Sequence, residues 1–359
     1  MDYPQVKMCD APQGRAAMME LIPCQPFDFN ETLRFVLSPP QLQNGRQFEP
    51  LLDHWADGEY RRLMLAGGEP VLYGVSPAGR PGAHTLRLRI VQGRKDAATL
   101  RAVARAVQHQ FKLAFDLKPF YAMAQRDPVL ALLSTHFAGM RIPQTLSAFE
   151  AVISAILEQQ VNLSFAHKVK KWLVETYGAK TEFEGCTYRA FPQPAALARA
   201  TAAELRQLQI SGPKARYLTG IARAVVEGSL DLEALAEREP AEALAVLTAQ
   251  KGVGDWTANY VGMRALGHPD SLPAADVGLQ KAVQFYYGLR RQPDAAGVEK
   301  IARAWKGWRS FGTFYLWLTY WREAPWRKQL QQEAAAARRK PKRQPARAAG
   351  TAATSVNSR

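Results

Sequence analysis

The sequence has little cysteine and no long apolar run, and both shortages exclude classes of protein. Its 359 residues include three cysteines, Cys9, Cys24 and Cys186, at unrelated spacings and without a CxxC pair. A disulfide framework, a zinc site and an iron–sulfur cluster are therefore not expected. No run of about eighteen apolar residues occurs, and the N-terminus has neither a basic start followed by an apolar stretch nor a small-residue cleavage site. We expect a cytoplasmic protein that does not enter a membrane.

Histidine is scarce and scattered. None of the six histidines has a second histidine at HxH or HxxxH spacing, and none has a pattern of acidic neighbours. Structural or surface roles are favoured over metal ligation or catalysis for all of them, namely His54, His84, His109, His136, His167 and His268.

Acidic residues are outnumbered by basic ones. The chain has 47 Lys and Arg against 32 Asp and Glu, a formal net charge of +15. The last 33 residues hold nine basic residues and one acid, so +8 lies at the C-terminus and +7 on the rest. A basic body suits a polyanionic partner such as nucleic acid, because neutralising phosphates releases counterions. Solubility alone is the alternative explanation.

Three regions differ in their residue pattern. Residues 1–119 contain short alternating runs such as RRLMLAGGEPVLYGV, separated by Gly and Pro, and should form a small α/β domain. Residues 120–326 have apolar spacings of three and four, as in SAFEAVISAILEQQV, and should be all helical. Residues 327–359 lack aromatics and nearly all aliphatic side chains, which predicts a disordered basic tail, either a DNA-tethering arm or a solubilising end.

A helix-hairpin-helix pattern spans residues 240–267. A helix ending in AEALAVLTAQ meets the turn KGVG, and Asp255 stands where an N-cap belongs before WTANYVGMRALG, which should stop at Gly267. The glycines Gly252 and Gly254 let the backbone approach a partner, and the N–H groups at the start of the second helix can hold a phosphate oxygen. An ordinary turn between two helices is the alternative.

These segments resemble a known family. QKGVGDWTANY, LPAADVGLQ and WKGWRSFGTFYLWLTYW are similar to helix-hairpin-helix DNA glycosylases, in the alkylated-base branch typified by bacterial 3-methyladenine DNA glycosylase II. The likeness covers about residues 26–326 and excludes the tail. It implies a mostly α fold of two helical subdomains with a small N-terminal α/β domain.

The same resemblance implies an activity. The expected enzyme flips alkylated purines, of the 3-methyladenine and 7-methylguanine type, out of damaged double-stranded DNA. It then hydrolyses the N-glycosidic bond and leaves an abasic site. We expect a monomer that is associated with the nucleoid and requires no cofactor.

Asp276 is the predicted catalytic residue. Breaking the glycosidic bond creates an oxocarbenium-like sugar, which a carboxylate can stabilise while orienting water. Position alone favours a helix N-cap at the start of VGLQKAVQFYYG, whereas the resemblance places the family's catalytic aspartate here. One extra residue lies between Pro273 and Asp276 relative to the type member of the family.

Aromatic residues are the predicted walls of the base pocket. Trp256 and Tyr260 are four residues apart on one helix face, and the resemblance adds Trp317 and, more weakly, Phe35. Their rings could stack on a cationic base, with about 2 kcal/mol for each good desolvated contact. Aromatics at this spacing are otherwise core residues. Val277 replaces a tyrosine of the type member, which predicts a more open pocket.

The remaining predicted contacts are with the DNA backbone. Gly252, Val253, Gly254 and Thr257 are the expected phosphate-binding residues of the hairpin. The resemblance further implies a monovalent cation, sodium or potassium, held by the main chains of Thr248, Gln250 and Val253.

Gln160, in ILEQQV, stands at the family's wedge position, where it would fill the space that the flipped nucleotide leaves. An apolar side chain can occupy that position in this branch. A polar glutamine on a helix surface is the alternative interpretation.

Two other functions compete with this one. The first is a glycosylase with lyase activity on oxidised bases, but such members place a lysine two residues after the second hairpin glycine, where this chain has Trp256. The second is a non-catalytic module that binds duplex DNA through the hairpin. A module of that kind has no need of Asp276 and three pocket aromatics.

Overall fold

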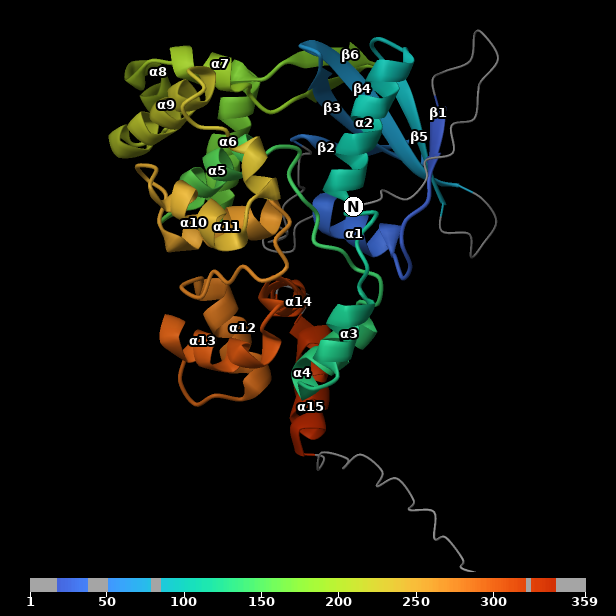
Figure 1. Cartoon of the computed structure of the whole chain (residues 1–359), viewed down its shortest axis with the longest axis vertical. Coiled ribbons are helices and arrows are strands. Elements are labelled where there is room, and N and C mark those ends of the chain that lie inside the picture. The colour runs from blue at the N-terminus through green and yellow to red at the C-terminus, as the bar shows by residue number, and fades with distance from the viewer. Residues whose placement is uncertain (1–17, 38–50, 79–84, 321–323, 340–359) are drawn as a thin grey trace, which may run out of the picture.

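The computed structural model describes residues 18–37, 51–78, 85–320 and 324–339. They form three bodies, each with its own hydrophobic core. Figure 1 shows a β-sheet with its helices on one side, a group of helices beside it, and a second group of helices below both. This arrangement confirms the predicted fold class of two helical subdomains and a small N-terminal α/β region.

The N-terminal body is a five-stranded antiparallel sheet in the order β1-β5-β4-β3-β2. Along β5, TLRLRIVQ, buried and more exposed residues largely alternate, so one face of the strand enters the core with α1 and α2. The elements are β1 (Met18–Leu21), α1 (Phe29–Leu37), β2 (Asp53–Ala56), β3 (Glu59–Ala66), β4 (Glu69–Ala78), β5 (Thr85–Gln92) and α2 (Ala97–Gln110).

The first helical subdomain surrounds α5, in which ten of eleven residues are buried. Ser147 caps this helix by accepting a hydrogen bond from the Glu150 amide. The helices of this subdomain are α5 (Ala148–Glu158), α6 (Leu163–Tyr177), α7 (Pro194–Arg199), α8 (Ala202–Gln207), α9 (Gly212–Val226), the short 3₁₀ helix η2 (Glu233–Glu237), α10 (Pro240–Thr248) and α11 (Asp255–Arg264).

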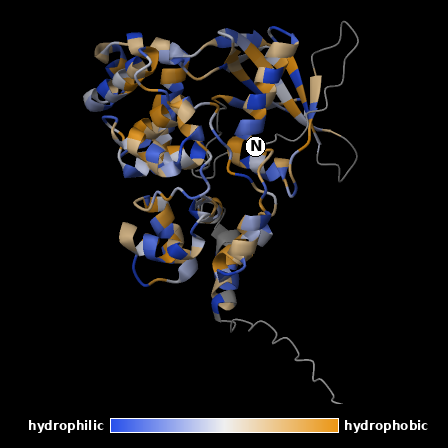
Figure 2. Cartoon of the chain, in the orientation of Figure 1, coloured by the Kyte–Doolittle hydropathy of each residue, from blue (hydrophilic) through white to orange (hydrophobic). Residues whose placement is uncertain are grey.

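The second helical subdomain is built from two separate segments of the chain. Its core joins residues before α5 to residues after α11, and Trp305 is fully buried in it. Its elements are α3 (Lys118–Ala124), α4 (Pro128–His136), α12 (Val277–Tyr287), α13 (Ala295–Ala302), η3 (Arg303–Trp305), α14 (Arg309–Tyr320) and α15 (Ala324–Arg339). Hydrophobic and hydrophilic residues share most of these helices (Figure 2), as expected for helices with one buried face.

Buried ion pairs fix the sheet against the first helical subdomain. The Arg62 guanidinium on β3 lies 2.8 Å from the Glu150 carboxylate on α5 and 2.9 Å from Asp53 on β2. Neighbouring Arg61 reaches across to Glu184 at 2.7 Å. The Arg62–Glu150 pair holds α5, whose C-terminal end enters the candidate site, and the Arg61–Glu184 pair joins the sheet to the turn between residues 183 and 186.

Two expectations about the chain's organisation are wrong in part. The region 120–326 is not all helical, because β6 (Lys180–Phe183) and β7 (Cys186–Arg189) form an antiparallel hairpin. Tyr188 of this hairpin is buried with Leu63 and Leu72 of the N-terminal sheet, so an apolar contact with another body stabilises the strands.

The tail predicted to be disordered from residue 327 is helical as far as Arg339, in α15. The stretch EAAAARR has high intrinsic helix propensity, and Leu330 and Ala334, four residues apart, are buried on the second helical core. The rest of the predicted tail lies outside the described residues.

Candidate active site

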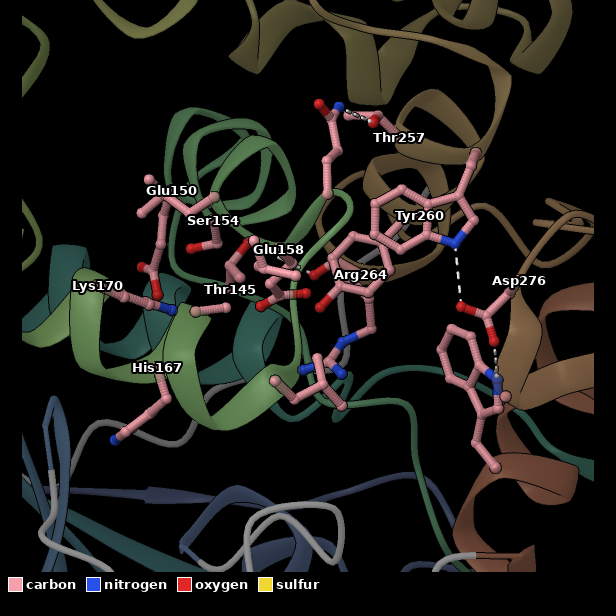
Figure 3. A pocket seen from close by; sticks show the side chains of 18 of the residues that line it. Thr145, Glu150, Ser154, Glu158, His167, Lys170, Thr257, Tyr260, Arg264 and Asp276 are labelled. Atoms are coloured by element: carbon pink, nitrogen blue, oxygen red, sulfur yellow. Dashed lines mark hydrogen bonds between the residues drawn. The ribbon is translucent and has the colours of Figure 1, made fainter. Parts of the chain in front are cut away.

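A cavity of about 1240 Å³ lies where the two helical subdomains meet. Small-molecule pockets typically measure roughly 300–1,000 Å³, so this cavity is large. Its wall comes from α5, α6 and α11 of the first subdomain, from the start of α12 and Trp317 of α14 in the second, and from α1, β2 and β3 of the N-terminal body. Figure 3 shows the acidic, basic and aromatic side chains of these helices converging on it.

Asp276 lies in this cavity and is the N-cap of α12, so the N-cap interpretation is confirmed, and the catalytic role stays a prediction. Its Oδ1 accepts hydrogen bonds from the Leu279 amide at 2.7 Å and from the Trp317 indole at 3.1 Å. Its Oδ2 accepts one from the Trp256 indole at 3.0 Å. An ionised carboxylate has about four acceptor positions. Three are used, and the remaining one is on Oδ2.

The three predicted pocket aromatics are brought together. The Trp256 and Tyr260 rings stack at a centroid distance of 5.4 Å, and Tyr260 lies 6.4 Å from Trp317. All three are partly buried and line the cavity. They also pack on each other, and Tyr260 and Trp317 pack on the second helical core, so the core interpretation is correct in part, and the role of the three rings as walls of a base pocket stays a prediction. Sequence reasoning missed that the two indoles hold Asp276.

Phe35 is the fourth wall that sequence reasoning placed here. It comes from α1 of the N-terminal body, lines the cavity, and packs edge-on against Phe314 with centroids 4.9 Å apart. The Arg264 guanidinium lies 5.2 Å from its centroid and 6.0 Å from that of Tyr260. Val277, at the rim of the cavity, has a side chain that is 55% exposed.

The end of α5 is tied to the hairpin. The Gln159 side-chain amide donates to the Gly252 carbonyl at 2.9 Å and to the Thr257 hydroxyl at 2.8 Å. Lys214 of α9 donates to the carbonyls of Leu157 and Gln159, which caps the C-terminus of α5.

The next residue, Gln160, therefore follows a turn that these hydrogen bonds fix in place. It is exposed, lines the cavity and has a φ of 54°, in the left-handed region that a non-glycine residue rarely occupies. It does not lie on a helix surface, so that alternative is wrong. Backbone strain of this kind is concentrated at functional positions.

The two glycines of the hairpin have different surroundings. Gly252 has a φ of 89°, and a Cβ there would lie 2.3 Å from the Tyr217 ring. Gly254 is exposed, and a Cβ added to it would have no other atom within 4 Å. Gly254, not Asp255, is the N-cap of α11 and provides no side-chain acceptor, so the predicted capping role of Asp255 is wrong. The N–H groups of the first turn lack a capping side chain.

Two hairpin side chains are less accessible than expected. Val253 is 5% exposed and belongs to the first helical core. Thr257 is 1% exposed, with its hydroxyl bonded to Gln159. Val253 and Thr257 could therefore contact a phosphate only through their main-chain atoms.

The predicted cation would bind where α10 ends. The carbonyls at the last turn of a helix have no intrahelical partner. Within the described part of the chain, no main-chain amide donates to the Thr248 or Val253 carbonyl, whereas the Gln250 carbonyl accepts from the Val253 amide at 3.1 Å. Hard carbonyl oxygens in this turn fit a monovalent cation.

Sequence reasoning missed several charged residues of the cavity wall, among them Glu158, Lys170 and Arg264. Glu158 is the last residue of α5, and burial raises the pKa of its carboxyl group, an effect that Lys170 and Arg264 oppose. The sequence does place Ser154 and Glu158 four residues apart on one helix. That spacing indicates a functional site only once the fold brings α11 and α12 to the same cavity as α5.

Other classes of site find no support in the part of the chain that the structure describes. No group of three or more His, Cys, Asp or Glu residues there could hold a metal ion. Cys24 and Cys186 are free thiols, and Cys9 lies outside the described residues. No described helix is both long enough and apolar enough to span a bilayer.

Comparison with known proteins defines the family. A family model described as "HhH-GPD superfamily base excision DNA repair protein" matches residues 153–308. DNA-3-methyladenine glycosylase of Bacillus subtilis is 37% identical over 215 residues, which are 60% of this chain and 71% of that protein. DNA-3-methyladenine glycosylase 2 of Escherichia coli is 28% identical over 265 residues, or 74% of this chain and 86% of that protein.

Comparison with solved structures agrees with the comparison of sequences. The solved structure of a 3-methyladenine DNA-glycosylase from Archaeoglobus fulgidus superimposes with a TM-score of 0.71 at 27% identity and covers 84% of this chain and 98% of that one. The chain belongs to the HhH-GPD superfamily of base excision DNA repair proteins. The resemblance predicted from the hairpin and its neighbouring motifs is confirmed.

Substituting Gly254 by alanine tests the clamp without disturbing the fold, because the new Cβ meets open space. We expect Gly254→Ala to weaken binding to every duplex about 10-fold, or ~1.4 kcal/mol, since the methyl group keeps a phosphate from the amides. Fluorescence anisotropy with lesion-bearing and undamaged duplexes measures this. Gly220→Ala, at an exposed helical position with equally open space, is the control. Weakening confined to lesion-bearing DNA would contradict the clamp.

Proposed function

We propose that the chain is a monofunctional DNA glycosylase that releases alkylated purines, of the 3-methyladenine and 7-methylguanine type, from damaged duplex DNA. The observation that carries the proposal is Asp276, oriented by two indoles in a cavity next to a phosphate-binding hairpin. The names of the Bacillus subtilis and Escherichia coli relatives and of the Archaeoglobus fulgidus structure agree with this substrate class.

The geometry of Asp276 suits a sugar cation. Its three N–H donors keep the carboxylate in one orientation, and the remaining acceptor position on Oδ2 is available to C1′ or to the attacking water. Preorganised charge of this kind stabilises the transition state without reorganisation during the reaction. An alkylated purine already carries positive charge, so its departure requires little assistance from an acid.

The walls of the cavity fit a flat cationic base. Trp256, Tyr260 and Trp317 offer π surface beside Asp276, and Phe35 closes the cavity from the N-terminal body. Gln160 occupies the rim, where it would enter the duplex in place of the flipped nucleotide.

The remaining predictions are part of the same proposal. Damaged double-stranded DNA is the partner, and a sodium or potassium ion in the hairpin turn would help to hold a phosphate. A monomeric state and a nucleoid-associated, cytoplasmic location are also proposed. A lyase acting on oxidised bases is disfavoured because an indole, Trp256, stands where such enzymes have an amine.

Replacing the carboxylate tests the chemistry. Asp276→Asn keeps the size of the side chain and an acceptor for the cap of α12, but removes the charge that stabilises the sugar cation. We expect base release to slow at least ~100-fold, with binding to a duplex carrying an abasic-site mimic nearly unchanged. Single-turnover assays and anisotropy measure the two quantities. Wild-type turnover in this variant would remove Asp276 from the mechanism.

The product tests the monofunctional assignment. Because Trp256 cannot form an imine, the product should be an intact abasic site, and strands should break only after alkali or heat. Borohydride added during turnover traps any imine as a covalent protein–DNA adduct. We expect none. A high yield of adduct means that some amine, such as that of exposed Lys251, reaches the sugar, and lyase activity must then be assigned.

A further inference from the structure

Besides Asp276, and besides Asp53 and Glu150, which pair with Arg62, the cavity is lined by one more carboxyl group, which the mechanism above does not use. Glu158 ends α5 and lines the cavity on the side away from Asp276, next to Tyr260 and Arg264 (Figure 3). Among the described residues it makes no hydrogen bond and no ion pair. A partly buried carboxyl group without a protein partner is costly unless a ligand completes its hydrogen bonds.

A second polar group on the same helix face is also without a partner. Ser154 lies four residues before Glu158, lines the same cavity and is 3% exposed. Its hydroxyl has no hydrogen-bond partner within the described part of the chain. Buried polar groups are nearly always hydrogen-bonded. The unpaired Ser154 hydroxyl and Glu158 carboxyl on one wall of the cavity therefore indicate where the polar atoms of a ligand would lie.

Because the cavity is the proposed base pocket, the polar atoms that would face Ser154 and Glu158 are those of the flipped base. Asp276 marks the sugar end of the pocket, and the aromatic side chains form its flat walls. Ser154 and Glu158 therefore face the purine ring at a position remote from the sugar. Ring nitrogens and exocyclic groups are the polar atoms that a purine offers there.

We propose that Glu158 is a second catalytic residue, a general acid that protonates a ring nitrogen of an uncharged purine lesion as the glycosidic bond breaks. This inference rests on the proposed glycosylase function. The C1′–N9 bond breaks with its electron pair on the base, and the Glu158 proton neutralises that charge. Water adds to C1′ and loses a proton to Asp276 or solvent. Glu158 regains its proton from solvent, so the net reaction is hydrolysis.

The electrostatic surroundings of Glu158 favour the protonated form of its carboxyl group. Burial, the largest effect, and the Asp276 carboxylate raise the pKa of Glu158, while nearby cations lower it, with a net rise. Burial raises the pKa of Tyr260, which therefore stays protonated beside Glu158. The charged or titratable groups around Glu158 are Glu150 on its own helix, His167 and Lys170 on α6, Lys214 on α9, Tyr260 and Arg264 on α11 and Asp276 at α12.

A comparison of cationic with uncharged lesions distinguishes the proposed acid role of Glu158 from the other roles proposed for the pocket. A cationic base such as 7-methylguanine leaves without an acid, whereas hypoxanthine is uncharged and needs one. General acid catalysis typically contributes 10²–10⁴-fold, so removing it should affect one lesion and spare the other.

The test is single-turnover excision of both lesions from the same duplex sequence. We expect Glu158→Gln, which keeps size but donates no proton, to slow hypoxanthine release ~100-fold and to change 7-methylguanine release by less than ~3-fold. In the wild type, hypoxanthine release should be fastest below the pKa of Glu158 and fall as the pH rises through it. That fall should be absent in the variant. Glu237→Gln, an exposed residue outside the cavity, is the matched charge control.

The other outcomes overturn the inference. Equal losses for both lesions would make Glu158 a structural or positioning residue, and a larger loss for 7-methylguanine would make it an ionised counter-charge. A wild type that releases 7-methylguanine but not hypoxanthine refutes the acid role and leaves the proposed function standing. A wild type that releases neither base refutes both.

Discussion

Three N–H groups from three helices fix the Asp276 carboxylate: the Leu279 amide of α12, the Trp256 indole of α11 and the Trp317 indole of α14. Because Trp256 is the second residue of α11 and Gly254 is the N-cap of that helix, the N-terminus of α11 links the hairpin turn to the Asp276 carboxylate, which is the N-cap of α12. In the proposed function, a phosphate bound at the turn would therefore lie at a fixed distance from the carboxylate that acts on the sugar. Two residues of chain would then couple the positioning of DNA to the chemistry.

The wider fold maintains this geometry from both sides. Gln159 joins α5 to the hairpin, and Lys214 caps the same end of α5, so Gln160, the proposed wedge, is held in place relative to the hairpin, the proposed phosphate clamp. Arg62 and Glu150 fix α5 to the N-terminal sheet, from whose body Phe35 reaches the cavity. The carboxyl groups that line the cavity lie in different environments: Asp276 is satisfied by N–H donors, Asp53 and Glu150 pair with Arg62, and Glu158 has no partner among the described residues. Environments that differ in this way are how enzymes assign different roles to chemically similar groups.

Sequence reasoning predicted the parts of this site that depend on local spacing. The glycine turn, the start of α12 at Asp276 and the four-residue interval between Trp256 and Tyr260 are all short-range patterns, and the structure brings them together. It missed what depends on tertiary placement. Nothing in the sequence shows that the two indoles point at Asp276, that Thr257 is buried against Gln159, or that Glu158 faces the cavity without a partner. The β6–β7 hairpin and the helical start of the tail were missed for the same reason, since apolar contacts with distant residues stabilise both.

Analysis of the released products by mass spectrometry tests the central claim most directly. Duplex DNA treated with a methylating agent is incubated with the purified chain, and small molecules are separated from the polymer. The account predicts free 3-methyladenine and 7-methylguanine, with abasic sites in equal number and no strand breaks before alkali treatment. Release of methylated nucleosides or nucleotides, or an absence of any free base under conditions in which the chain binds the duplex, would contradict it.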